Sequence, residues 1–193
     1  MRGLGFMIQY LDSAKRQFMM YKQLGEKAMA QLDEQELNWH ANEDSNSIAT
    51  IVKHMWGNML SRWTDFLTTD GEKPWRQRDA EFENDHRTRD QLMQKWNEGW
   101  QCVFNALDSI TDADLEKIIY IRNEGHTILE ATNRQIAHYS YHVGQIVYIS
   151  KLRSKEEWKS MSIPRNKSNE YNSGKFSQEK ERRHFTDDWL EKK

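Results

Sequence analysis

Residues 133–148, with the sequence NRQIAHYSYHVGQIVY, are the most informative segment of the chain. The segment has no proline and one glycine, and its apolar residues recur at helical spacing, which predicts an α-helix. His138 and His142 are four residues apart, so both side chains project from one face of that helix. Gln135 and Gln145 extend this polar line in both directions. A buried polar group without a partner costs about 1–3 kcal/mol, so these side chains need partners, and a metal ion is one candidate.

The composition is typical of one helical domain with a sizeable core. The 193 residues include many charged side chains and few glycines and prolines, and the net charge is only −2. This charge gives no basic footprint for nucleic acid and none for an anionic membrane surface. No apolar run has the length of a signal peptide or a membrane span. The single cysteine, Cys102, excludes an internal disulfide, and it lies among apolar residues that favour a buried hydrophobe over a nucleophile. We therefore expect a cytoplasmic protein without nucleic-acid or membrane partners.

Hydrophobic periodicity predicts four long helices, over residues 6–32, 47–67, 88–109 and from 128 or 129 to 152. A long polar connection over residues 68–87 separates the second helix from the third. Connections of this length in compact domains are usually functional or cross between distant elements. The pattern predicts an all-α fold, a four-helix bundle with a long crossover between helices two and three.

Two smaller features accompany the helices. Residues 118–128 contain two short apolar runs around the turn Arg122 to Gly125, which indicates a small β-hairpin. The chain becomes polar and irregular near its end. We therefore divide it into a bundle over residues 1–163 and a polar C-terminal extension over residues 164–193, with a short charged helix expected near residues 178–190.

A third metal ligand must come from another helix, because two ligands seldom hold an ion. The best candidate is His54, at the edge of the apolar stripe of the second helix. Together with His138 and His142 it would give three imidazole ligands and leave coordination positions open, which is the arrangement of catalytic sites. Imidazole suits zinc and nickel, with iron and manganese as alternatives. Asn58 lies one turn beyond His54, and Arg62 one turn further, so both can orient ligands or bind an anion.

Other chemistries find little support in the sequence. There is no glycine-rich phosphate loop, no cysteine pair for structural zinc and no Gly-x-Ser-x-Gly motif. A di-iron bundle needs Glu-x-x-His pairs on two helices, and none of His54, His138 and His142 has a glutamate three residues before it. His126, just before the fourth helix, can approach one end of the site. Each histidine taken alone is also compatible with an ordinary core or surface role. Trp96 and Trp100 have the spacing of core residues, with an aromatic substrate wall as the alternative.

The histidine pattern resembles the DinB/YfiT-like superfamily of metal-dependent four-helix bundles. The resemblance rests on His54 and on His138-x-x-x-His142-Val143-Gly144-Gln145. The run HMWGNMLSRW at residues 54–63, the loop at residues 70–73 and the segment at residues 158–164 are similar to a bacterial branch of unknown function. The resemblance extends from the first helix to about residue 172.

The resemblance implies a histidine triad formed by His54, His138 and His142, and it implies a homodimer. Characterised relatives include S-transferases that use bacillithiol or mycothiol, and an isomerase that uses mycothiol. By analogy we expect a metal-dependent enzyme with a small-molecule substrate, either a thiol-dependent S-transferase or a hydrolase, whose cofactors are a divalent metal and a low-molecular-weight thiol. The alternative is a non-catalytic, stress-related binding or scaffold protein with a structural metal or none. No residue is assigned a catalytic role from the sequence.

Overall fold

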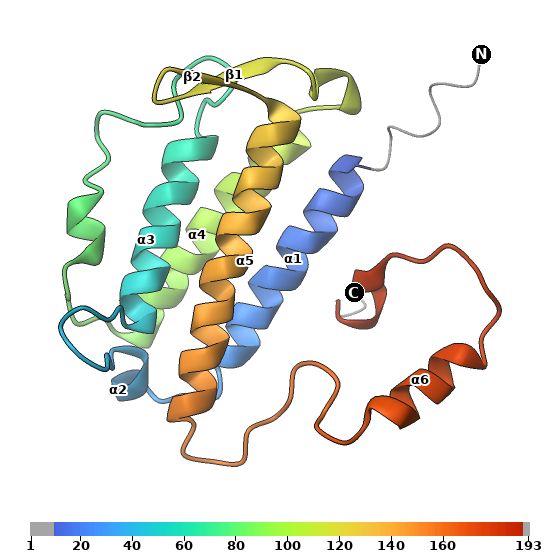
Figure 1. Cartoon of the computed structure of the whole chain (residues 1–193). Helices are drawn as coiled ribbons and strands as arrows, with labels where there is room; N and C mark the ends of the chain where they lie inside the picture. Colours follow the sequence, from blue (N-terminus) through green and yellow to red (C-terminus); the bar gives the residue numbers. More distant parts are fainter. Residues whose placement is uncertain (1–9, 191–193) are drawn as a thin grey trace.

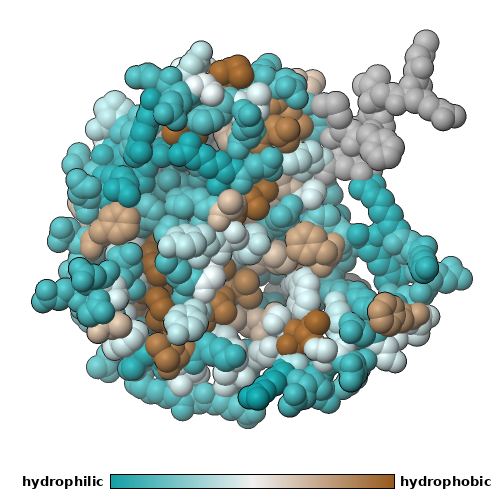
Figure 2. Space-filling model, viewed as in Figure 1, coloured by the Kyte–Doolittle hydropathy of each residue, from teal (hydrophilic) through white to brown (hydrophobic). Residues whose placement is uncertain are grey.

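A computed structural model describes residues 10–190 of the chain. Its main feature is a set of four long helices that lie side by side: α1 (Tyr10–Met29), α3 (Ile48–Trp63), α4 (Arg89–Asp108) and α5 (Ile128–Arg153) (Figure 1). Helix α3 packs mainly on α4, and α1 packs mainly on α5. The prediction of a mostly helical protein is therefore confirmed. Hydrophilic residues cover most of the face seen in Figure 2, with smaller hydrophobic areas among them. None of the helices in residues 10–190 is long and apolar enough to cross a membrane.

Hydroxyl side chains fix where three of these helices begin. Ser47 accepts a hydrogen bond from the backbone N–H of Thr50 at the start of α3. Thr88 and Thr127 form capping boxes at the starts of α4 and α5, which satisfy otherwise unpaired N–H groups. The predicted boundaries of these helices agree with the structure within a few residues. The first predicted helix, over residues 6–32, begins outside the described residues. In the structure α1 already ends at Met29, and the short α2 (Glu34–Leu37) follows it.

A β-hairpin corrects the all-α prediction. Strands β1 (Ile118–Ile121) and β2 (Glu124–Thr127) pair antiparallel, with Ile121 opposite Glu124, as the two apolar runs in this region indicated. The turn residues Arg122 and Asn123 have φ values of 57° and 63°, the left-handed conformation that a tight two-residue hairpin turn requires. The Asp70 carboxylate accepts hydrogen bonds from both of their backbone N–H groups, each at 2.8 Å. The hairpin tip is thus tied to the connection that follows α3.

The connection between α3 and α4 determines the relative direction of these two helices. It returns along α3 to the end where that helix begins, so α3 and α4 point in the same direction and α1 and α5 in the other (Figure 1). Part of the connection forms the short 3-10 helix η2 (Asp79–Phe82), which packs against α3. The connection is therefore placed beside His54, the histidine of α3.

The C-terminal extension differs from its prediction. Its helix is α6 (Ser168–Phe176), followed by the short η4 (Phe185–Asp188), whereas residues 178–184 are not helical. The run EKERR at residues 179–183 offers no apolar face for a helix to bury. Between α4 and the hairpin, the short 3-10 helix η3 (Asp112–Asp114) begins after Thr111.

Aromatic side chains join the helices in the core. The Phe18, Trp100 and Tyr139 rings, from α1, α4 and α5, have centroids 5.6–6.1 Å apart. Trp96 is also buried, so both tryptophans of α4 are core residues. Cys102 is half-buried, and burial raises the pKa of its thiol, which leaves it a small apolar side chain with little thiolate.

Gly25 allows the Trp96 ring to reach the backbone of α1. A Cβ atom at Gly25 would lie 2.6 Å and 2.7 Å from two carbons of that buried ring. We expect Gly25→Ala to lower the free energy of unfolding by about 1–3 kcal/mol, the usual cost of overpacking a core. Urea denaturation measures the change. The matched control is Gly144→Ala in α5, where nothing lies within 4 Å of the added methyl group. That variant should be neutral or gain up to about 1 kcal/mol. If Gly25→Ala and Gly144→Ala were equally stable, the Trp96 ring would be able to move aside at no cost, which would contradict the prediction.

Candidate metal centre

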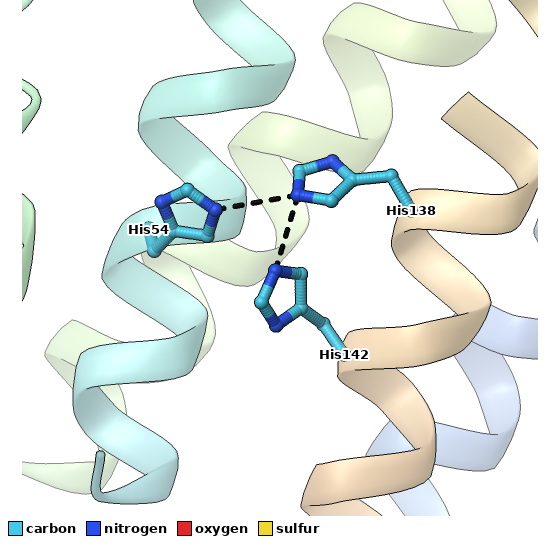
Figure 3. Close-up of side chains that lie close together, drawn as sticks. All are labelled: His54, His138 and His142. Atoms are coloured by element: carbon cyan, nitrogen blue, oxygen red, sulfur yellow. Dashed lines mark hydrogen bonds between the residues drawn. The ribbon is translucent and has the colours of Figure 1, made fainter. Parts of the chain in front are cut away.

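Three histidines from two helices converge on one point. His54 projects from α3, and His138 and His142 project from α5 (Figure 3). The Nε2 atom of His138 lies 3.4 Å from Nε2 of His54 and 3.1 Å from Nε2 of His142. One ligand nitrogen from each residue lies within 4.8 Å of the other two, and the cluster contains no fourth His, Cys, Asp or Glu from the described residues. The structure thus brings together the three residues that the sequence singled out.

Two of the three rings are oriented by partners on their far side. Nδ1 of His54 lies 2.9 Å from Oε2 of Glu81, and Nδ1 of His142 lies 2.8 Å from Oε1 of Gln145. Both oxygens are acceptors, so each Nδ1 carries the proton and donates it. The lone pair of each Nε2 then faces the centre of the cluster, where a metal ion would need it.

Burial and the neighbouring groups keep the His138 and His142 rings uncharged. Burial lowers the pKa of His138 to about 3, and the neighbouring His142 and His54 add to this effect. Burial also lowers the pKa of His142, although the hydrogen bond to Gln145 opposes the shift. Both rings are therefore neutral at pH 7. Neutral imidazole is the form that binds metal.

Glu81 is the functional residue that the sequence analysis missed. Its carboxylate accepts hydrogen bonds from Arg76 Nε at 2.8 Å and Arg76 Nη2 at 2.9 Å, besides the one from His54. Burial raises the pKa of Glu81, but the bonds from His54 and Arg76 outweigh burial, so the pKa lies below its usual value. A side chain at Gly57 would clash with this carboxylate, because a Cβ there would lie 2.8 Å from Glu81 Cδ. The glycine inside a predicted helix, three residues after His54, was the signal available in the sequence.

A cavity of about 440 Å³ opens beside the triad. Its lining includes the three histidines, five arginines, the amides Asn58, Gln135 and Gln145, and the rings of Phe82 and Tyr141. This volume falls in the range of small-molecule sites in proteins. The triad therefore borders a space that a small molecule can occupy.

Comparison with known proteins adds one finding. A family model described as "Protein of unknown function (DUF1572)" matches residues 5–167. The chain belongs to this family. The expectation of an uncharacterised domain family is thereby confirmed, and the relation to DinB-like proteins stays a prediction. No curated protein and no solved structure matches the chain.

The polar neighbours expected around the triad of this DUF1572 domain have different partners. Gln145 holds His142, as described above. Asn58 Oδ1 accepts a hydrogen bond from the Tyr139 hydroxyl at 3.2 Å. Gln135 is 3% exposed and lines the cavity, yet its Oε1 has no hydrogen-bond partner among residues 10–190. Gln135 is therefore the amide with hydrogen-bonding capacity left for a bound molecule.

Arg62 and His126 have roles other than those considered from the sequence. Arg62 Nη1 donates to the carbonyl of Gly71, and both Nη atoms lie 3.3 Å from the Glu72 carboxylate. The guanidinium fork of Arg62 is thus largely used to hold the connection against α3. His126 lies 3.4 Å from Arg134 and is no part of the triad.

Proposed function

We propose that His54, His138 and His142 bind a divalent metal ion, with zinc or nickel favoured and iron or manganese as alternatives. One observation carries the proposal. Three imidazole nitrogens face one point, while the Nδ1 atoms of His54 and His142 are occupied by Glu81 and Gln145. Metal-binding histidines commonly have such an acceptor behind the ring, because it fixes the tautomer and the orientation.

The open side of the site favours an enzyme over a scaffold protein. Three protein ligands leave coordination positions free, and the adjoining cavity leads to them. A divalent ion bound here would act as a Lewis acid and lower the pKa of a coordinated thiol or water. The protein would supply the rest. Glu81 and Gln145 hold the His54 and His142 rings, burial keeps His138 and His142 neutral, and the Gln135 amide can orient a molecule in the cavity.

The arrangement of the helices supports a more specific proposal. Four long helices with a long crossover, and ligands on the second and fourth of them, are what a DinB/YfiT-like four-helix bundle would have. On that analogy the protein is a metal-dependent enzyme, a thiol-dependent S-transferase or a hydrolase. A low-molecular-weight thiol similar to bacillithiol would be its cosubstrate, and we propose a homodimer in the cytoplasm.

Two measurements on the purified chain test this function. Elemental analysis should find close to one equivalent of a transition metal, because the three ligands are already positioned. Transfer of bacillithiol to an electrophile should stop after treatment with EDTA and return when zinc or nickel is restored. A transfer rate that does not respond to EDTA would argue against a metal-activated thiol, and a metal-free protein that cannot be loaded would argue against the site itself.

A further inference from the structure

Arginine side chains dominate the lining of the cavity. The lining contains no acidic residue, and its five arginines come from α3, the connection, the hairpin and α5: Arg62, Arg76, Arg78, Arg122 and Arg134. The chain as a whole has 30 acidic and 28 basic residues, so its composition does not account for this gathering. The cavity beside the triad is thus a local region of positive charge.

Three of these arginines are matched by carboxylates of the described residues. Glu72 lies 3.3 Å from Arg62, 3.5 Å from Arg76 and 3.0 Å from Arg122, and Arg76 also binds Glu81. Two carboxylates shared among three guanidinium groups compensate their charge only in part.

Arg78 and Arg134 lack a comparable partner in residues 10–190. Arg78 has only Asp79, at 3.8 Å, and that carboxylate is fully exposed. Arg134 forms no ion pair with the described residues, and its side chain has one hydrogen-bond partner among them, the His126 ring. Both guanidinium groups therefore retain most of their capacity to bind an anion.

The positions of these two arginines place them around the triad. Arg134 lies one helical turn before His138 on the same face of α5. Arg78 lies over the Phe82 ring, 5.2 Å from its centroid, and the Phe82 and His54 ring centroids are 4.8 Å apart. Both guanidinium groups therefore lie near the metal-binding histidines, one on α5 and the other on the connection between α3 and α4.

Arg122 reaches the cavity from the hairpin tip. Its φ of 57° is unusual for a long side chain, and the Asp70 carboxylate holds its backbone N–H in that turn. The helix α5, the connection and the hairpin thus all contribute guanidinium groups to the cavity lining.

A metal ion would make this charge distribution unfavourable unless an anion binds with it. The three histidine ligands are neutral, so a divalent ion would keep its full charge beside several arginines. The ion and the guanidinium groups beside it would repel one another, and this repulsion is stronger where water is partly excluded. A ligand with a negative charge removes the repulsion and pairs with the guanidinium groups. The unpartnered Oε1 of Gln135 adds an acceptor for a hydroxyl, amine or other donor on the same ligand.

We infer that the cavity binds the anionic group, a carboxylate or a phosphate, of a small substrate through Arg78 and Arg134, beside the metal-binding histidines. The inference deepens the proposed function and rests on it for the place of the metal. The planar guanidinium fork suits both anions, because it can donate two parallel hydrogen bonds. Arg62, which the sequence suggested for anion binding, has both Nη atoms occupied by Gly71 and Glu72, and its Nε has no partner among the described residues.

Titration calorimetry on the full chain tests the inference with two probes, inorganic phosphate and succinate. Each probe is titrated into the zinc-loaded protein and into protein stripped with EDTA. We expect at least one probe to bind, and the tighter one identifies the anion as phosphate or carboxylate. Arg78→Gln and Arg134→Gln should each weaken binding about tenfold or more, equivalent to about 1.4 kcal/mol. The control Arg165→Gln changes an exposed arginine outside the cavity lining and should bind as tightly as the unchanged chain.

The outcomes separate this inference from the proposed function. Weaker binding in both cavity variants, but not in the control, supports the anion site even if the chain holds no metal. Variants that bind as tightly as Arg165→Gln would overturn the inference while leaving a metal site intact. Failure of both probes to bind at millimolar concentration, in either form of the protein, would also overturn it. Both substituted side chains are exposed, so thermal melting should show that the variants fold normally.

Discussion

Replacing both His138 and His142 with alanine is expected to remove the metal from the purified protein. The double change leaves His54 as the only ligand nitrogen of the cluster. Loss of a residue that merely supports a ligand commonly costs 10–100-fold in metal affinity, so loss of two ligands should cost more than about 100-fold. Elemental analysis after desalting would then find little metal in the variant, where the unchanged chain should hold close to one equivalent.

The control removes two histidines that lie outside the cluster. His40 and His86 are exposed, and the change His40→Ala with His86→Ala should leave the metal content unaltered. Circular dichroism would establish that both double variants keep their helices. Metal retained after loss of His138 and His142 would contradict the assignment of the site. An equal loss in both double variants would point to nonspecific binding by histidines.

The sequence predicted the helices well because their determinants are local. Capping residues such as Thr88 and Thr127 lie directly before the helices that they start, and apolar spacing marks the buried faces. The triad was predictable for a related reason. His138 and His142 share a helical face through their spacing alone, and His54 lies at the edge of an apolar stripe that had to meet another helix.

What the sequence could not place depends on the path of irregular chain. Glu81 reaches His54 only because the connection returns along α3, and no periodicity encodes that path. The partners of Arg62 were unpredictable for the same reason, since Gly71 and Glu72 belong to the connection. In the C-terminal extension, Ser168–Phe176 forms a helix without any buried residue, so there was no apolar stripe to locate it.

Arg76→Ala is expected to cost about 3 kcal/mol or more of folding stability. The side chains of Arg76 and Glu81 are only 2% and 7% exposed, and two hydrogen bonds join them. Removing one member of a buried pair leaves the other charge without compensation, and this typically costs 3–5 kcal/mol. Urea denaturation at pH 7 measures the loss. Lys167→Ala is the control, since its pair with Glu170 is 60% and 74% exposed and should contribute less than about 1 kcal/mol.

The pH dependence of this loss distinguishes a charge effect from a packing effect. The pKa of Glu81 is lower in the folded chain than its ordinary value of 4.5, because the bonds from His54 and Arg76 outweigh burial. The resulting stabilisation is fully present above pH 4.5 and is lost as the pH falls through the folded pKa. The stability difference between the unchanged chain and Arg76→Ala should therefore narrow below pH 4.5. A difference that stays constant with pH would assign the cost to lost packing. The double change Arg76→Met with Glu81→Gln, which removes both charges, should recover much of the stability at pH 7.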